Sequence, residues 1–336
     1  MLKTKFMKTF FVGIDISKDW LDVALVDGES MCVTDAFKED NTVEGIGKIL
    51  RKCARKSQDN KLWFCFEHTG NYGLLLAQLL ENGGFVYSAV PALEIKQSIG
   101  MTRGKNDQVD AERIAFYAAA NAYKLKESKL PGKQLLRVKH LLTHRTQLVK
   151  ISQQLQNSRK STIVADKSVD LKDLIESLES KICEIKAEIN AIEEKIKAQI
   201  AANDKLQENF KKITTVKGVG LMIAATMIVC TNNFTAFEDP RKFNCFAGLA
   251  PFSYSSGSSI QGKTRTSFLR NKNMKKLLFN GANTAVMYDH ELSNYYKRKK
   301  SEGKHHMVVI NAVACKIVYR IFAVLKREEP YVNLTR

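Results

Sequence analysis

The feature of this sequence that most constrains its fold is a run of aliphatic residues spaced alternately four and three apart. It lies within a stretch, from about residue 130 to 210, in which proline and glycine nearly vanish. Such spacing lines one helix face with apolar side chains over about four heptads, which predicts a coiled coil or a long helical hairpin, and with it a dimer contact. A helix packed on its own domain is the alternative. The seam comprises Leu171, Ile175, Leu178, Ile182, Ile185, Ile189, Ile192 and Ile196.

The residues before this stretch predict an α/β domain. Residues 10–40 contain three strand-like runs, and LWFCFEHT is a continuous apolar run typical of a buried central strand. Helical patterns then alternate with strand patterns up to FVYSAV. Three strands in a row followed by this alternation indicate a mixed sheet with helices packed on it, the ribonuclease-H-like pattern.

The residues after 210 predict a compact, mostly helical domain that begins with a helix-hairpin-helix-like turn, VKGVG at 216–220. Glycines in such a turn let backbone N–H groups approach a phosphate. Lys217, Gly218 and Gly220 are therefore candidate nucleic-acid contacts. A simple turn joining two helices is the alternative.

Charge indicates the partner. The 336 residues include 53 Lys and Arg against 35 Asp and Glu, a net charge of +18. An excess of this size points to nucleic acid, or less often to an anionic membrane surface. The most basic stretch, 261–300, has ten Lys and Arg against two acidic residues, and it supplies the candidate contacts Lys263, Arg265 and Arg270.

Cysteine usage and hydropathy favour a cytoplasmic protein. The seven cysteines are scattered without a CxxC pair, which favours reduced, buried thiols over disulfides or zinc sites. There is no HExxH motif and no run of 18 apolar residues. The N-terminus passes directly into strand-like sequence, so neither a membrane span nor a signal peptide is expected.

Four carboxylates carry the strongest indication of function: Asp15 in FFVGIDIS, Glu67 in LWFCFEHTG, and Asp107 with Asp110 in KNDQVDAE. Side chains at strand ends project into the crevice above the carboxyl edge of a sheet, and residues i and i+3 share one helix face. Carboxylates are the hard oxygen ligands of Mg²⁺. In a basic protein, such a site predicts phosphate chemistry on a polyanion.

Each carboxylate also has a purely structural interpretation. Many strands end in Asp, and the GIDxS start also fits sugar-kinase and actin-like ATPases. Glu67 would cap the turn into NYGLL, and Asp107 with Asp110 would be a solvated helix N-terminus favoured by the helix dipole. The order and spacing of all four favour the metal site.

A serine-rich stretch, YSSGSS at 254–259, precedes the basic residues. Such a stretch is usually a flexible loop. A hydroxyl beside guanidinium groups, however, combines a nucleophile with charge stabilisation for phosphoryl transfer. The residues alone do not select one serine from the five that lie between positions 253 and 259.

Spaced motifs throughout the chain resemble those of the insertion-sequence one-hundred-ten family of transposases, the bridge-RNA-guided DNA recombinases. The motifs are VGIDISKDWLDVALVDG, FEHTGNYG, KNDQVDAERIA, GVG and FAGLAPFSYSSGSSIQGKTRTS. The connector matches in position more than in sequence. The resemblance implies a RuvC-like metal-binding domain over 1–128, a coiled-coil connector for dimerisation over 129–208 and a transposase domain over 209–336.

The resemblance also implies roles. Asp15, Glu67, Asp107 and Asp110 would form a D-E-D-D quartet that binds Mg²⁺, and Ser256 would be the nucleophile that forms a phosphoserine–DNA link. The adjacent Ser255 departs from the family pattern, because a shift of one residue would choose it instead. The family's composite site joins two protomers, which implies a dimer, and a tetramer in the synaptic complex. An element-encoded bridge RNA would pair with donor and target DNA, and the protein would associate with the nucleoid when bound to DNA.

Four hypotheses follow. The first is a recombinase that excises and inserts an element through serine chemistry and a Holliday-junction-like intermediate. The second is a metal-dependent Holliday-junction-type endonuclease whose C-terminal domain only binds. The third is a nucleic-acid-binding protein without enzymatic activity. The fourth, an ATP-dependent sugar-kinase-like enzyme, fits poorly with a charge of +18 and with the lack of a second phosphate loop.

Overall fold

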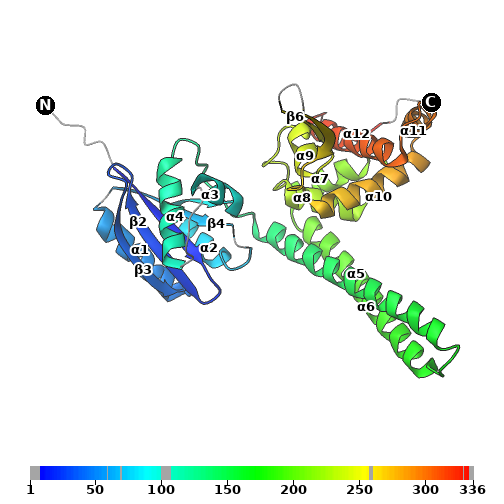
Figure 1. Cartoon of the computed structure of the whole chain (residues 1–336), viewed down its shortest axis with the longest axis horizontal. Helices are drawn as coiled ribbons and strands as arrows, with labels where there is room; N and C mark the ends of the chain where they lie inside the picture. The colour runs from blue at the N-terminus through cyan, green and yellow to red at the C-terminus, as the bar shows by residue number, and fades with distance from the viewer. Residues whose placement is uncertain are drawn as a thin grey trace. The chain divides into compact units, whose positions relative to one another are not determined.

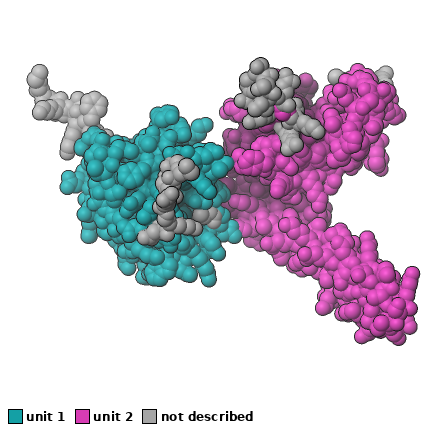
Figure 2. Space-filling model, viewed as in Figure 1, with its two compact units in different colours: residues 1–130 teal, residues 131–336 magenta. Residues whose placement is uncertain are grey.

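The computed structural model describes residues 8–58, 60–68, 70–99, 107–256, 260–327 and 329–332 (Figure 1). Contacts within the chain divide it into two compact units, Met1–Leu130 and Pro131–Arg336 (Figure 2). Each unit has its own hydrophobic core, so each is treated by itself below.

The first unit is built on a five-stranded mixed sheet with the order β3-β2-β1-β4-β5. β1 pairs antiparallel with β2 and parallel with β4; β2 and β3 are antiparallel, and β4 and β5 are parallel. This confirms the predicted mixed sheet, and the strand order is that of a ribonuclease-H-like fold. The strands are β1 (Thr9–Ile16), β2 (Trp20–Asp27), β3 (Cys32–Asp40), β4 (Lys61–Glu67) and β5 (Val86–Val90).

Helices cover both faces of this sheet. They are α1 (Val43–Ser57), α2 (Leu74–Asn82), α3 (Ala92–Ile99) and α4 (Asp107–Ala120). Phe64 and Phe66 of β4 pack in the core that contains residues of α1 and α2. Cys65, between them, packs in the core that contains residues of α3 and α4. Because successive strand residues point to opposite faces and both faces are covered, β4 has the continuous apolar sequence of a central strand.

The second unit begins with a helical hairpin of α5 (Lys133–Ala165) and α6 (Lys172–Ala201). Ile182, Ile192 and Ile196 of the aliphatic seam are buried, and α6 packs along α5 of the same chain. Arg145 of α5 bridges to Glu193 of α6, with 2.6 Å between nitrogen and oxygen. The seam is therefore used within the chain, and a contact with a second protomer stays a prediction.

The rest of the second unit is mostly helical, with a separate two-stranded antiparallel sheet. Its helices are α7 (Asp204–Thr214), α8 (Leu221–Cys230), α9 (Pro240–Phe246), α10 (Lys272–Tyr288), α11 (His290–Ser301) and α12 (His306–Arg327). The sheet consists of β6 (Pro251–Ser256) and β7 (Ile260–Thr266), so the serine stretch begins in a strand and not in a loop.

Among the described residues, α12 is the one helix long and apolar enough to cross a membrane by length and composition. Val313, Ile317 and Ile321 on one of its faces are buried in the core of the second unit. One such helix is weak evidence for a span, because the core helix of a soluble protein passes the same test. The predicted absence of a membrane span is consistent with this packing.

Candidate active site and nucleic-acid interface

Two of the predicted carboxylates lie at one edge of the sheet. Asp15 is the penultimate residue of β1, and Glu67 is the last residue of β4. These neighbouring strands are parallel, with Ile14 opposite Phe66, so the next residues along both chains emerge at the same edge. Asp15 and Glu67, 52 positions apart in the sequence, are therefore side by side because of the strand pairing.

The other two carboxylates are brought to this edge by α4, which crosses the sheet over β1 and β2 (Figure 1). A Cβ atom on Gly13 would lie 2.2 Å from the carbonyl oxygen of Ala111 and 2.3 Å from the nitrogen of Ala115. Glycine is thus required for the helix to approach the strand this closely. Asp107 and Asp110 lie in the first turn of that helix.

The electrostatics of Asp15 indicate that the other three carboxylates lie near it. The pKa of Asp15 is raised to about 6, first by burial and then by the negative charges of Asp107, Asp110 and Glu67. A smaller contribution comes from Asp22. Like charges this close to a half-buried carboxyl group disfavour its ionised form, and a bound cation would reverse that effect.

Asp22 is a fifth acidic residue that the sequence analysis missed. It lies directly opposite Asp15 in the antiparallel pairing of β1 with β2 and is only 7% exposed. Its Oδ2 atom is 3.6 Å from Nζ of Lys38. The available signal was a lone acid within the apolar run WLDVALV, together with the short turn that sets the register of the two strands.

The carboxylates do not form a closed set of ligands. Oδ1 of Asp110 accepts a hydrogen bond of 2.7 Å from the guanidinium of Arg113. No group of three or more His, Cys, Asp or Glu among the described residues is arranged to hold a metal ion. The two observations are compatible, because charge repulsion acts over several ångströms whereas Mg²⁺ requires oxygen atoms at about 2.0–2.1 Å.

The predicted helix-hairpin-helix turn lies between α7 and α8. Gly218 has a φ of +85°, and a Cβ atom there would lie 2.3 Å from the carbonyl oxygen of Gly281 in α10. Gly220 is the N-cap residue of α8 and makes no side-chain capping bond. Lys217 is exposed beside them. The turn therefore joins two helices and is also held against a third.

The other predicted contacts lie on or near the two-stranded sheet. Ser256 ends β6 and pairs with Ile260 of β7. Lys263 and Arg265 belong to β7, but the side chains of these two residues, Ser255 and Ser256 lie outside the described part of the structure. The guanidinium of Arg270 donates a 2.9 Å hydrogen bond to the carbonyl oxygen of Ser267 and packs against Gly248.

Lys275 is a further basic residue near this sheet that the sequence analysis did not single out. Its Nζ donates a 2.8 Å hydrogen bond to the carbonyl oxygen of Gly248 and lies 3.4 Å from Oγ1 of Thr266 in β7. Burial lowers the pKa of Lys275, and the charge of Arg270 lowers it as well. Two cations thus meet at the base of the ribbon that contains Ser256.

Comparison with known families decides the assignment. Residues 12–166 match the model of the DEDD transposase of IS110, and residues 211–297 match the transposase family IS116/IS110/IS902. The chain belongs to the IS110 family of transposases. This confirms the resemblance to the insertion-sequence one-hundred-ten family, and as an IS110-family transposase the protein is a DNA-processing enzyme.

Relatives of this IS110-family transposase match over different lengths. The pilin gene-inverting protein of Moraxella bovis is 24% identical over 333 residues, covering 97% of this chain and 98% of that protein. The protein of the same name from Moraxella lacunata is also 24% identical, over 332 residues. The insertion element IS110 43.6 kDa protein of Streptomyces coelicolor is 28% identical over 167 residues, which cover 50% of this chain but only 40% of that protein.

Among solved structures, the IS110-family transposase resembles RuvC of T. thermophilus in complex with a Holliday junction substrate. That match covers 36% of this chain and 99% of that chain, with 14% identity and a TM-score of 0.29. A similarity this low carries no argument about activity. The ribonuclease-H-like assignment rests on the strand order and pairing of the first unit.

Proposed function

We propose that this transposase excises and inserts an insertion element by breaking and rejoining DNA with a serine nucleophile, guided by a structured, element-encoded bridge RNA and dependent on Mg²⁺. The observation that carries its metal-dependent part is geometric: the parallel ends of β1 and β4 and the first turn of α4 bring Asp15, Glu67, Asp107 and Asp110 near one edge of the sheet, where burial and the neighbouring negative charges raise the pKa of Asp15. A site that concentrates negative charge in a chain of net charge +18 is suited to a divalent cation that meets a phosphate.

The donor set fits Mg²⁺, because all four groups are carboxylates and Mg²⁺ prefers oxygen ligands. Asp15, Glu67, Asp107 and Asp110 would hold the ion, with Asp110 keeping one oxygen on Arg113. When bound, Mg²⁺ would neutralise charge on the scissile phosphate and hold it in place. Gly13 would serve this site indirectly, because it sets how close the first turn of α4 lies to Asp15.

In the proposed reaction, Oγ of Ser256 attacks a DNA phosphodiester. An O–P bond forms between serine and phosphate, the bond from phosphorus to one deoxyribose oxygen breaks, the hydroxyl loses its proton and the leaving oxygen gains one. Attack by a hydroxyl group of another strand reverses these steps and releases the serine. Lys263, Arg265 and Arg270 would stabilise the developing charge.

The proposal includes self-association. The quartet of one protomer would meet Ser256 of another, so the active unit would be at least a dimer. In the synaptic complex it would be a tetramer. Donor and target DNA and the bridge RNA would be its partners. Full-length similarity to proteins named for inverting a pilin gene supports rearrangement of DNA as the overall outcome.

A trapping experiment tests the nucleophile. Purified protein, element-derived RNA, Mg²⁺ and end-labelled DNA are incubated, and a DNA–protein adduct is sought on a denaturing gel. We expect an adduct with the wild type and with Ser255→Ala, and none with Ser256→Ala. An adduct that persists in Ser256→Ala and vanishes in Ser255→Ala would move the nucleophile by one residue.

The same experiment separates the alternative, a metal-dependent Holliday-junction-type endonuclease without serine chemistry. That enzyme would cleave labelled junctions with Mg²⁺ whether or not Ser256 is present, and it would never form an adduct. Omission of the RNA tests guidance, because a guided recombinase should lose target-specific adducts while retaining its affinity for DNA.

A further inference from the structure

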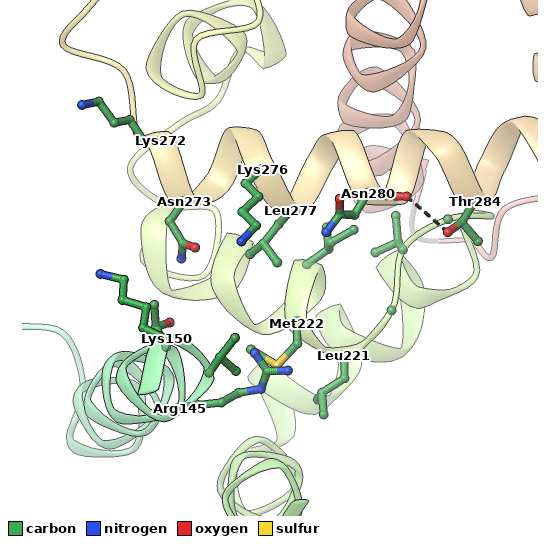
Figure 3. Close-up of a pocket in the computed structure, with 17 residues that line it drawn as sticks. Arg145, Lys150, Leu221, Met222, Lys272, Asn273, Lys276, Leu277, Asn280 and Thr284 are labelled. Atoms are coloured by element: carbon green, nitrogen blue, oxygen red, sulfur yellow. Dashed lines mark hydrogen bonds between the residues drawn. The ribbon is translucent and has the colours of Figure 1, made fainter. Parts of the chain in front are cut away.

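The second unit contains a pocket of about 970 Å³ (Figure 3). Three segments distant in sequence line it: the middle of α5, the turn and first residues of α8, and α10 from Lys272 to Thr284. Four basic residues line the pocket, and no aspartate or glutamate is among its lining residues: Arg145, Lys150, Lys272 and Lys276.

Most of these positively charged side chains have no acidic partner among the described residues. Among the residues that the structure describes, no carboxylate lies within ion-pair distance of Lys150, Lys272 or Lys276, and all three side chains are exposed. Arg145 uses part of its guanidinium on Glu193. In Figure 3, Lys276 extends from α10 toward the space above α8, and Arg145 extends from α5 toward Met222. Unpaired like charges from separate elements repel each other unless an anion joins them.

Gly220 gives an independent indication of a ligand. Its φ is −97° and its ψ is −176°, a conformation open to any residue, and a Cβ atom there would meet nothing within 4 Å. Neither backbone strain nor packing within the chain therefore requires glycine. Ser, Thr, Asp or Asn would cap α8 better. A bare backbone here leaves the first N–H groups of the helix open to the pocket.

We propose that this pocket binds the phosphate backbone of duplex DNA. One phosphate would lie against the start of α8 at Gly220, and Lys150, Lys276 and Arg145 would neutralise it and its neighbours. This inference rests on the proposed function, in that the chain acts on DNA. It adds residues of α5 and α10 to the interface, and no sequence pattern joins these residues to the glycine turn.

The lining also indicates the form of the nucleic acid. No aromatic side chain lines the pocket, so it offers no stacking surface for unpaired bases. Lysine, arginine and backbone N–H groups contact phosphate without reading sequence. The pocket would therefore hold a duplex in position, while recognition of sequence would depend on other contacts.

Equilibrium binding tests the proposal. The full chain is titrated into fluorescently labelled duplex DNA of arbitrary sequence, without Mg²⁺, at several salt concentrations. Lys150→Gln and Lys276→Gln should each weaken binding about three- to tenfold and lower the slope of log Kd against log salt by about 1. Lys160→Gln is the matched control: it removes an exposed lysine of the same helix about 15 Å along its axis from Lys150.

Gly220→Asp separates binding from folding. Aspartate is a favoured N-cap, so the melting temperature should equal or exceed that of the wild type. Its charge and bulk would nevertheless occupy the phosphate position, and we expect a loss of at least tenfold in DNA affinity. Gly220→Asn adds a side chain of similar bulk without charge, so it should lose less DNA affinity than Gly220→Asp.

Three results would overturn the inference. The first is a normally folded Gly220→Asp protein that binds DNA with wild-type affinity, and the second is a DNA affinity of the Lys150→Gln and Lys276→Gln variants equal to that of Lys160→Gln. The third is a set of variants that bind duplex RNA more weakly while their binding of DNA is unchanged. The last result would assign the pocket to RNA. A wild-type chain that binds no DNA at all would overturn the proposed function as well, so the two failures are distinguishable.

Discussion

Gly13 of β1 and Ala111 of α4 are in backbone contact, so close that a Cβ atom on the glycine would lie 2.2 Å from the alanine carbonyl oxygen. The contact fixes the separation of helix and sheet beside four acidic residues. It therefore links an ordinary packing requirement to the geometry of the candidate active site. Gly13, two residues before Asp15, is therefore as strictly required by the site as Asp15 itself.

Gly13→Ala should force α4 away from β1. We expect a loss of about 1–3 kcal/mol in the free energy of unfolding, typical of overpacking, and a fall in Mg²⁺-dependent adduct formation even where the protein remains folded. Denaturant unfolding and the trapping gel measure the two effects.

Gly47→Ala is the control, because it lies in α1 with only the end of Arg51 near its Cβ position, at 3.4 Å. Replacing a helical glycine there should leave stability unchanged or raise it by about 0.5–1 kcal/mol. Equal losses in the two variants would contradict the special role of Gly13.

Ionisation of Asp15 should make the metal-free protein less stable at neutral pH. The folded pKa of about 6 lies above the ordinary value of 3.8, so the folded state binds the proton more tightly than the unfolded state. Stability is then greatest below about pH 4 and falls as pH rises through 6. At pH 7.5 with EDTA, Asp15→Asn should be more stable than the wild type by about 1–2 kcal/mol, a discounted value for a half-buried group.

Thermal unfolding at pH 4 and pH 7.5 checks this prediction. The advantage of Asp15→Asn should disappear at pH 4, where the wild-type carboxyl group is also protonated. Addition of Mg²⁺ at pH 7.5 should stabilise the wild type more than the variant. Asp19→Asn, an exposed aspartate in the turn after β1, should change nothing. A wild type whose stability rises between pH 4 and 7 relative to Asp15→Asn would refute the assignment.

Asp289 should be among the most sensitive residues of the second unit. Its Oδ1 caps α11 by accepting from the Leu292 nitrogen at 3.0 Å, and its fully buried Oδ2 lies 2.8 Å from the guanidinium of Arg320 in α12. Asp289→Ala should lower the free energy of unfolding by about 3–5 kcal/mol, because it removes a cap and leaves the arginine charge without its buried partner.

Glu291 provides the comparison for Asp289. It pairs with the same arginine at 2.5 Å, but its side chain is 49% exposed. Glu291→Ala should cost less than about 1 kcal/mol. Chemical denaturation of both variants tests whether burial, and not the ion pair alone, determines the loss.

Gly218→Ala should destabilise the second unit for two reasons, its φ of +85° and its contact with Gly281. Gly303→Ala isolates the first reason, since Gly303 has a φ of +79° but nothing within 4 Å of its Cβ position. We expect about 1 kcal/mol for Gly303→Ala and at least 2 kcal/mol more for Gly218→Ala. Equal losses would mean that the turn can move away from α10.

The sequence predicted what depends on local pattern. The apolar run of β4 and the acids at strand ends indicated a mixed sheet with carboxylates at one edge, because strand periodicity and strand polarity are encoded locally. The position of Asp22 could not be found in this way, since it depends on an antiparallel register. The aliphatic seam likewise predicted a helical partner without identifying α5 of the same chain.

The need for glycine at position 13 could not be predicted from the sequence either, because it depends on contact with a helix about 100 residues later in the chain. The basic pocket joins Arg145 to Lys276 across a distance in sequence that no spacing rule spans. The serine stretch appeared loop-like, since serine has no strong strand preference, and the pairing of β6 with β7 places it at the end of a ribbon.

The ion pair between Arg145 and Glu193 gives the α5–α6 hairpin a mechanical property. Arg145 lines the pocket and also ties α5 to α6, and α5 continues for about 30 Å beyond it. An anion that draws Arg145 away from Glu193 would remove one tie between the two arms of the hairpin, so occupancy of the pocket would act on the contact between α5 and α6.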